Sequence, residues 1–171
     1  MSEFTPLQLH HREQGFCVAS HAHLLVMVWG RDARGTDLEH LAERQQQVID
    51  THGFAQVISV IRAGLSINVP EEVREASKDN VKRFSADTRG SATIVEIAGV
   101  RAAFFRSLVT TLTLLTRSPM PQKVFTNIDE GLDWLRSLPD TKPEQLVSRS
   151  QLHAGVYALA DHFGTPAPSG P

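Results

Sequence analysis

One short apolar run between two helical patterns constrains the fold of this chain more than any other feature. Residues 55–61 (AQVISVI) are rich in β-branched side chains and show no regular alternation of polar and apolar positions. Such a run is typical of a strand that is buried on both faces of its sheet. Because helices must then cover both faces, the run predicts an α/β fold.

A helical pattern lies immediately before this strand. Over residues 36–51, apolar side chains recur every three or four positions, as one face of a helix requires. Thr36 and Glu39 have the spacing of a capping box at its start, and Gly53 marks its end. The apolar positions are Leu38, Leu41, Ala42, Val48 and Ile49.

The chain begins with a different pattern. Residues 15–30 (GFCVASHAHLLVMVWG) are apolar with a polar break in the middle, which predicts two antiparallel strands joined by a turn. Residues 1–13 are polar and show no sustained period. We therefore expect a flexible arm followed by an opening pair of strands.

The alternation of helix and strand continues after the buried run. A helix with a charged outer face is followed by an apolar strand at residues 92–97 and a long apolar helix at residues 100–117. A short strand at residues 123–125 precedes a helix for which Asn127 and Glu130 form a second capping-box pair. This order predicts a mostly parallel sheet covered by helices and connected by right-handed crossovers.

These patterns divide the chain into four parts. We expect a flexible arm at residues 1–13, one α/β domain at residues 14–139, a C-terminal helical extension at residues 140–163, and a disordered tail at residues 164–171. Trp134 lies within the apolar pattern of the domain's last helix, so we expect it to anchor that helix in the core.

Charge and cysteine content exclude several classes of function. The 17 Lys and Arg residues against 19 Asp and Glu residues leave a net charge of −2, which gives no positive field for nucleic acid or an anionic membrane. Cys17 is the only cysteine, which excludes an internal disulfide and indicates a reducing cytoplasm. The longest apolar stretch, residues 102–115, contains Arg106 and is too short to cross a bilayer, and the N-terminus lacks the apolar run of a secretory signal. We expect a cytoplasmic protein with no transmembrane segment.

Three local motifs resemble the STAS-like domains related to the sporulation regulator SpoIIAA. The strand at residues 24–29 ends in a glycine before a polar turn and a helix, like the family's first long strand. Residues 98–101 (AGVR) are similar to the family's strand-to-helix junction, and residues 123–125 followed by residues 129–135 (DEGLDWL) are similar to its closing strand and helix. The likeness covers about residues 14–138.

The resemblance implies a STAS-like fold and a binding function without chemistry. Domains of this group act as regulators that bind a partner protein or, in lipid-carrying relatives, as carriers of an apolar ligand. Phosphorylated members have an Asp-Ser-Ser-Gly turn after the third strand, and the corresponding residues 62–70 (RAGLSINVP) lack it. Ser66 lies in this region, and we interpret it as a turn residue.

Two polar features could bind a ligand, and each has a simpler structural interpretation. Residues 30–35 (GRDARG) lie between a strand and a helix but lack the lysine of a phosphate loop, which favours a capped surface turn. His21 and His23 would share one side of an extended strand and could bind a metal if His10 or His11 supplied a third ligand. A polar turn with exposed histidines is the simpler reading, so we expect neither a metal nor another cofactor.

The spacing of residues along the sequence does not indicate a catalytic site. No nucleophile, base and orienting acid lie close together in the sequence, and Cys17 alternates with small residues on the opening strand, as a packing residue does. We therefore expect a protein that is not an enzyme and has no catalytic residues.

The long apolar helix at residues 100–117 has more large apolar side chains than one sheet-facing stripe requires. We predict a non-enzymatic regulatory or scaffolding module that binds a partner protein and self-associates as a homo-oligomer. The alternative is a carrier or sensor of a lipid or another small apolar ligand. The candidate interaction surface combines side chains of this helix with those of the C-terminal extension: Phe105, Val109, Leu112, Leu146, Val156 and Phe163.

Overall fold

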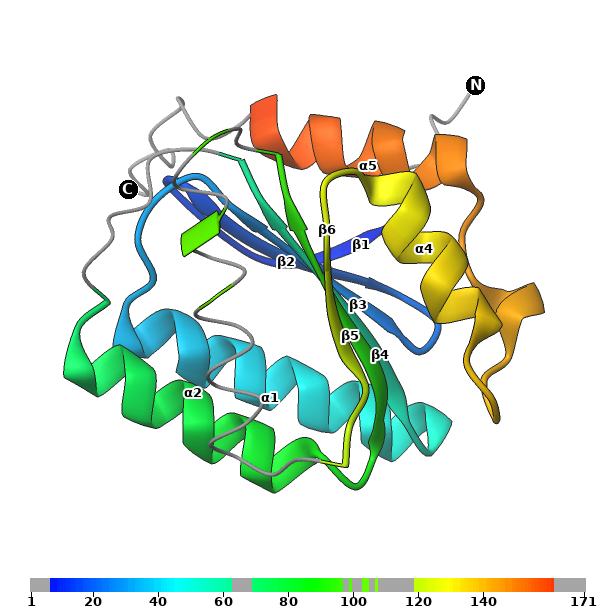
Figure 1. Cartoon of the computed structure of the whole chain (residues 1–171), viewed down its shortest axis with the longest axis horizontal. Helices are drawn as coiled ribbons and strands as arrows, with labels where there is room; N and C mark the ends of the chain where they lie inside the picture. The colour runs from blue at the N-terminus through cyan, green and yellow to red at the C-terminus, as the bar shows by residue number, and fades with distance from the viewer. Residues whose placement is uncertain are drawn as a thin grey trace, which may run out of the picture.

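A computed structural model describes residues 7–62, 69–96, 99, 103–104, 107 and 119–161 of the chain. These residues form a six-stranded sheet whose spatial order follows the order of the sequence (Figure 1). The strands are β1 (Gln8–Glu13), β2 (Phe16–His21), β3 (Leu24–Trp29), β4 (Ala55–Ile61), β5 (Thr88–Val95) and β6 (Gln122–Phe125). The first three are antiparallel and the rest join β3 in parallel, so the predicted α/β fold class is confirmed.

Helices cover both faces of the sheet. On one face lie α1 (Gly35–His52) and α2 (Glu71–Phe84); on the other lie α4 (Ile128–Ser137) and α5 (Arg149–Asp161), joined through a short 3-10 turn, η1 (Pro143–Gln145) (Figure 1). The apolar period predicted α1, α4 and α5, and the charged outer face predicted α2. The long helix expected at residues 100–117 falls almost entirely outside the described residues.

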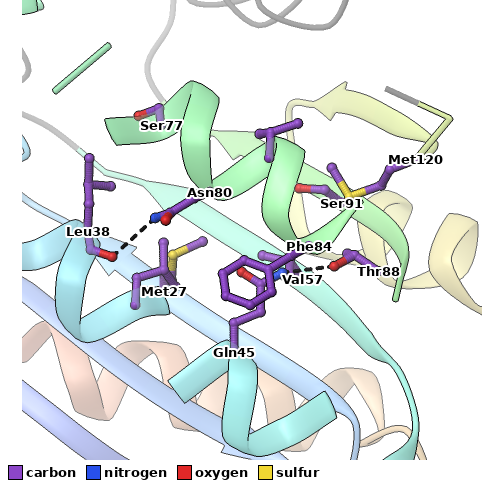
Figure 2. A pocket seen from close by; sticks show the side chains of 12 residues that line it. Met27, Leu38, Gln45, Val57, Ser77, Asn80, Phe84, Thr88, Ser91 and Met120 are labelled. Carbon is purple, nitrogen blue, oxygen red and sulfur yellow. Dashed lines mark hydrogen bonds between the residues drawn. The ribbon is translucent and has the colours of Figure 1, made fainter. Parts of the chain in front are cut away.

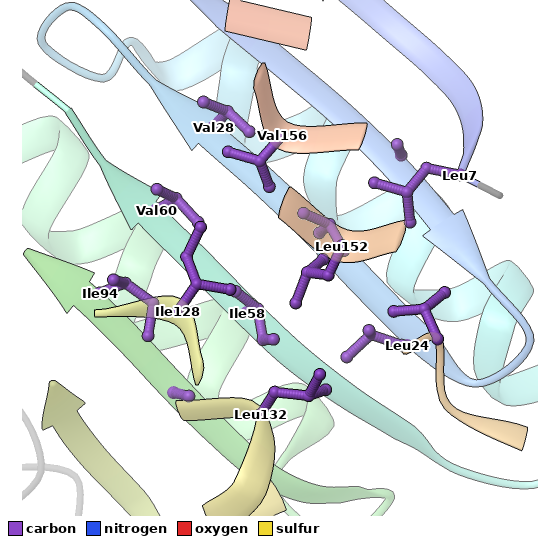
Figure 3. Packing of buried hydrophobic residues seen from close by; sticks show 14 of the residues in the cluster. Leu7, Leu24, Val28, Ile58, Val60, Ile94, Ile128, Leu132, Leu152 and Val156 are labelled. Atoms are coloured by element: carbon purple, nitrogen blue, oxygen red, sulfur yellow. The ribbon is translucent and has the colours of Figure 1, made fainter. Parts of the chain in front are cut away.

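The central strand β3 is buried over its whole length because its side chains alternate between two cores. Three of them meet the buried faces of α1 and α2: Leu25, Met27 and Trp29. The other three, Leu24, Val26 and Val28, pack against α4 and α5. Figure 3 shows Leu132, Leu152 and Val156 of these helices pointing toward the sheet. A strand with two buried faces explains the continuous apolar run in its sequence.

The predicted capping pair is present at the start of α4 but not at the start of α1. At α4, the Glu130 backbone N–H donates to the Asn127 side chain at 2.9 Å, as predicted. At α1, the helix begins one residue before Thr36, and the Asp37 carboxylate accepts the backbone N–H of Arg34 at 2.8 Å. The expected Thr36 and Glu39 pair is therefore wrong, because a buried acid within the first turn takes that role.

The expectation of a flexible arm at residues 1–13 is wrong for residues 8–13, because these residues form strand β1. This strand pairs with β2, and the pairing skips one residue between Leu9 and His11, which makes a β-bulge at His10. The bulge shifts the alternation of polar and apolar side chains by one position. That shift is why the sequence shows no strand period there. Residues 1–6 lie outside the described part.

The C-terminal extension packs on the same domain. Leu152, Val156 and Leu159 of α5 and Leu146 before it are buried in the core shared with β2 to β5. Trp134, expected as a core anchor, is only partly buried, and its ring lies 5.6 Å from that of Phe125. The tail expected to be disordered, residues 164–171, lies outside the described residues.

None of the helices in the described part of the chain combines sufficient length with sufficient hydropathy to span a membrane.

We expect Leu152→Ala to lower the free energy of unfolding by about 2–5 kcal/mol, because the side chain is fully buried between α5 and the sheet. Urea denaturation measures the change. Ala158→Gln, at an exposed position of the same helix, is the control and should stay within about 0.5 kcal/mol of the parent. Equal stability of Leu152→Ala and the parent would show that α5 is not docked on the sheet.

Candidate functional site

A cavity of about 150 Å³ lies between α1, α2 and the sheet. Figure 2 shows side chains from both helices and from the strands pointing into it. Its lining residues are Met27, Leu38, Leu41, Gln45, Val57, Ser77, Asn80, Val81, Phe84, Thr88, Ser91 and Met120. The cavity therefore lies between the buried side of α1 and the face of β3 and β4 that this helix covers.

Apolar side chains make up most of the wall. Leu38 and Leu41 come from the buried stripe of α1, and Met27 and Val57 come from neighbouring strands of the sheet. Phe84, at the C-terminal end of α2, is 3% exposed and lies over the space between helix and sheet. A wall of this kind favours an apolar ligand, since burying apolar surface is the main source of binding free energy.

A few polar groups interrupt the apolar wall. The Gln45 Nε2 group donates to Thr88 Oγ1 at 2.9 Å, and the Asn80 Nδ2 group donates to the Leu38 carbonyl at 3.1 Å (Figure 2). Each amide also has a carbonyl oxygen that can accept a hydrogen bond. These groups can orient a ligand that has a hydroxyl or an amine.

Sequence analysis missed this pocket, although one signal was present. Gln45 is a polar residue within the apolar stripe of α1, four positions after Leu41, and it is 8% exposed. A buried polar residue in such a stripe needs a partner, and the partner here is Thr88, which lies far away in the sequence. Nothing in the local pattern identifies that partner.

The lining residues set the chemistry that the pocket supports. Among those described, none is an acid, a base, a histidine or a cysteine. The hydroxyls of Ser77, Thr88 and Ser91 do line it, but a hydroxyl acts as a nucleophile only when an adjacent base activates it. The described wall can therefore bind and orient a molecule through contact and hydrogen bonds.

The candidate interaction surface divides into two groups. Phe105, Val109, Leu112 and Phe163 lie outside the described residues. Leu146 and Val156, 7% and 0% exposed, are buried in the core of their own chain. The last two must be corrected, because their apolar side chains already pack against the chain's own sheet and offer no surface to a partner.

The predicted pair of histidines on one strand is not formed. Ala22 has a left-handed backbone (φ 48°), so His21 ends β2 and His23 lies in the turn that follows. His23 is fully buried: its Nε2 atom lies 3.1 Å from Gln56 Oε1, and its ring lies 4.6 Å from that of Phe54. A polar turn is confirmed, but the expectation that both histidines are exposed is wrong for His23.

The remaining candidates have structural roles. Cys17 is fully buried, and this burial raises the pKa of its thiol to about 11, which suits a packing residue. In the loop at residues 30–35, the Arg31 guanidinium points inward and donates to both carboxylate oxygens of Asp37. This supports the capped turn over a phosphate site. Ser66 lies outside the described residues.

No protein-family model, curated protein or solved structure matches this chain. The resemblance to STAS-like domains therefore stays an expectation drawn from the motifs.

We expect acid to destabilise the domain through His23. Burial lowers the pKa of its imidazole below the ordinary 6.5, so the unfolded chain binds a proton at pH values where the folded chain does not. Stability from this residue is thus fully present above about pH 6.5 and declines as the pH falls below it. The expected result is a smaller loss of unfolding free energy between about pH 7 and pH 5 in His23→Gln than in the parent.

Urea denaturation at several pH values tests this prediction. His21→Gln, two residues away and partly exposed, is the matched control for the loss of an imidazole. His10, whose pKa is also lowered by burial, contributes in the same direction and is left intact in both variants. The same pH dependence in His23→Gln and in the parent would contradict the assignment.

Proposed function

We propose that this domain is a non-enzymatic sensor or carrier that binds a small, largely apolar molecule between α1, α2 and the sheet. The proposal depends on one observation, the cavity itself, which has a mostly apolar wall and a few hydrogen-bonding groups. Concave, mostly apolar pockets with a few polar groups in the wall are the usual sites for small-molecule ligands.

The volume limits the size of the ligand. An apolar protein cavity of roughly 150 Å³ holds benzene, which is the same volume as found here. Drug-sized ligands occupy pockets of about 300–1,000 Å³. The pocket therefore suits a molecule of about six to ten non-hydrogen atoms, such as a monocyclic aromatic with one hydroxyl or amino group.

The described surface gives less support to a protein-binding module. Among the described residues, the large hydrophobic side chains that are exposed are Leu9 at 45% and Tyr157 at 47%. Two side chains do not form the apolar patch of several hundred Å² that typically marks an interface. Partner binding and self-association stay predictions that depend on residues 100–117 and Phe163, outside the described part.

Native mass spectrometry of freshly purified protein tests the proposal directly. We expect the mass of the chain plus a small retained molecule, or, after extraction, binding of phenol or toluene as probes in ligand-observed NMR. The same spectrum reports the number of subunits, so a ligand-free dimer would favour the interaction module instead. Failure of the stripped protein to bind any monocyclic probe would contradict the proposed function.

We expect Ser91→Leu to abolish binding of these probes, because the larger side chain occupies the cavity. The measurement is the rise in melting temperature that a saturating probe causes in the parent. Ser137→Leu makes the same exchange at an exposed position on α4, on the opposite face of the sheet, and should leave the rise unchanged. Equal probe-induced shifts in both variants would place the binding site elsewhere.

A further inference from the structure

Three side chains that can bind a metal converge at the edge of the sheet, away from the pocket wall. They are His11 and Glu13 of β1 and His40 of α1. One ligand atom from each lies within 4.8 Å of the others. The two imidazole rings are stacked, with centroids 3.9 Å apart and an angle of 22° between their planes.

Strand pairing brings these residues together. His11 pairs with Val18 and Glu13 pairs with Phe16, and both partners belong to the core beneath α1. Paired residues of antiparallel strands point to the same face, so His11 and Glu13 point toward α1. His40 lies in the second turn of that helix and meets them there.

Arg31 holds the carboxylate of this cluster in place. Its Nη2 atom lies 3.2 Å from Glu13 Oε2, and its Nε group donates to the Gln14 carbonyl at 2.7 Å. The other oxygen of the carboxylate, Glu13 Oε1, lies 3.2 Å from His11 Nε2. A carboxylate held through one oxygen presents the other to the two imidazoles, which is how surrounding hydrogen bonds orient metal ligands.

The charge and the hydrogen bonding of the cluster suit a cation. Glu13 and Asp37 contribute two negative charges and Arg31 contributes one positive charge, so the group is net negative when both histidines are neutral. His11 Nε2 is buried, and although it lies 3.2 Å from Glu13 Oε1 it makes no hydrogen bond of normal geometry within the described residues. A buried ring nitrogen with an incomplete hydrogen bond is costly, and coordination to a metal would satisfy it.

We propose that His11, Glu13 and His40 bind a divalent transition-metal ion, with Zn²⁺ as the representative of this class. Two imidazole nitrogens and one carboxylate oxygen are a donor set that Zn²⁺ accepts in proteins, with a fourth position left for water. Ligand atoms of a tetrahedral zinc ion lie about 3.4 Å apart, so the cluster must contract and the stacked rings must turn until one nitrogen of each points at the ion. His40 can make this movement because it is only partly buried.

Isothermal titration of chelator-treated, full-length protein with ZnCl₂ tests the site. We expect one Zn²⁺ per chain and at least a tenfold loss of affinity in His11→Gln and in His40→Gln. Glu13→Gln should also weaken binding, because the amide is a poorer ligand than the carboxylate. Titration with Co²⁺ gives an independent readout, since visible absorption bands of tetrahedral intensity should appear in the parent and disappear in His11→Gln.

His153→Gln is the matched control because it removes an imidazole that is paired with Asp129, on the other face of the sheet. Circular dichroism establishes that each variant is folded. Zinc binding that is as tight in His11→Gln and His40→Gln as in the parent would overturn the proposal, as would the absence of micromolar binding in the parent. Neither result affects the pocket, because the probes bind there without metal.

Discussion

A buried ion pair between Arg31 and Asp37 holds together the elements on which the rest of the structure depends. Asp37 is fully buried, and it accepts two hydrogen bonds from Arg31 and one from the backbone of Arg34. These bonds raise the pKa of Arg31, and the same guanidinium reaches Gln14 in the turn between β1 and β2. Loss of one member would leave an uncompensated buried charge. The pair therefore fixes the start of α1, which contributes to both the pocket and the histidine cluster.

The two helical layers are packed in different ways. On the α4 and α5 face, glycines allow close approach: a Cβ at Gly131 would lie 2.4 Å from Ile94 Cδ1, and one at Gly155 would lie 2.5 Å from Leu7 Cδ1. Buried polar groups on this face form a hydrogen-bond chain, in which the Gln56 amide contacts His23 and donates to the Leu135 carbonyl. The α1 and α2 face contains the cavity instead.

Local sequence patterns predict most of the fold but little of either candidate site. Element order could be predicted because the apolar period changes from helix to strand at each boundary. Strand β1 could not, because the bulge moves Leu9 and His11, which a regular strand would place together, to opposite faces. The pocket forms where residues of α1, α2 and the sheet meet, and the only local signal for it is Gln45, a buried polar residue in the apolar stripe of α1. The metal cluster joins His11 to His40 through strand pairing, which no local spacing encodes.

The order of the elements along the chain has a consequence for synthesis on the ribosome. Strands β2 to β5 and helices α1 and α2 are complete by residue 95, whereas α4 and α5, the described helices on the second face of the sheet, begin at residues 128 and 149. Proteins emerge from the ribosome N-terminus first. Until α4 and α5 have left the exit tunnel, the growing chain lacks the helices that bury Val26, Ile58 and Ile94 on this face of the sheet. During that interval the nascent chain exposes the kind of surface that chaperones shield from aggregation.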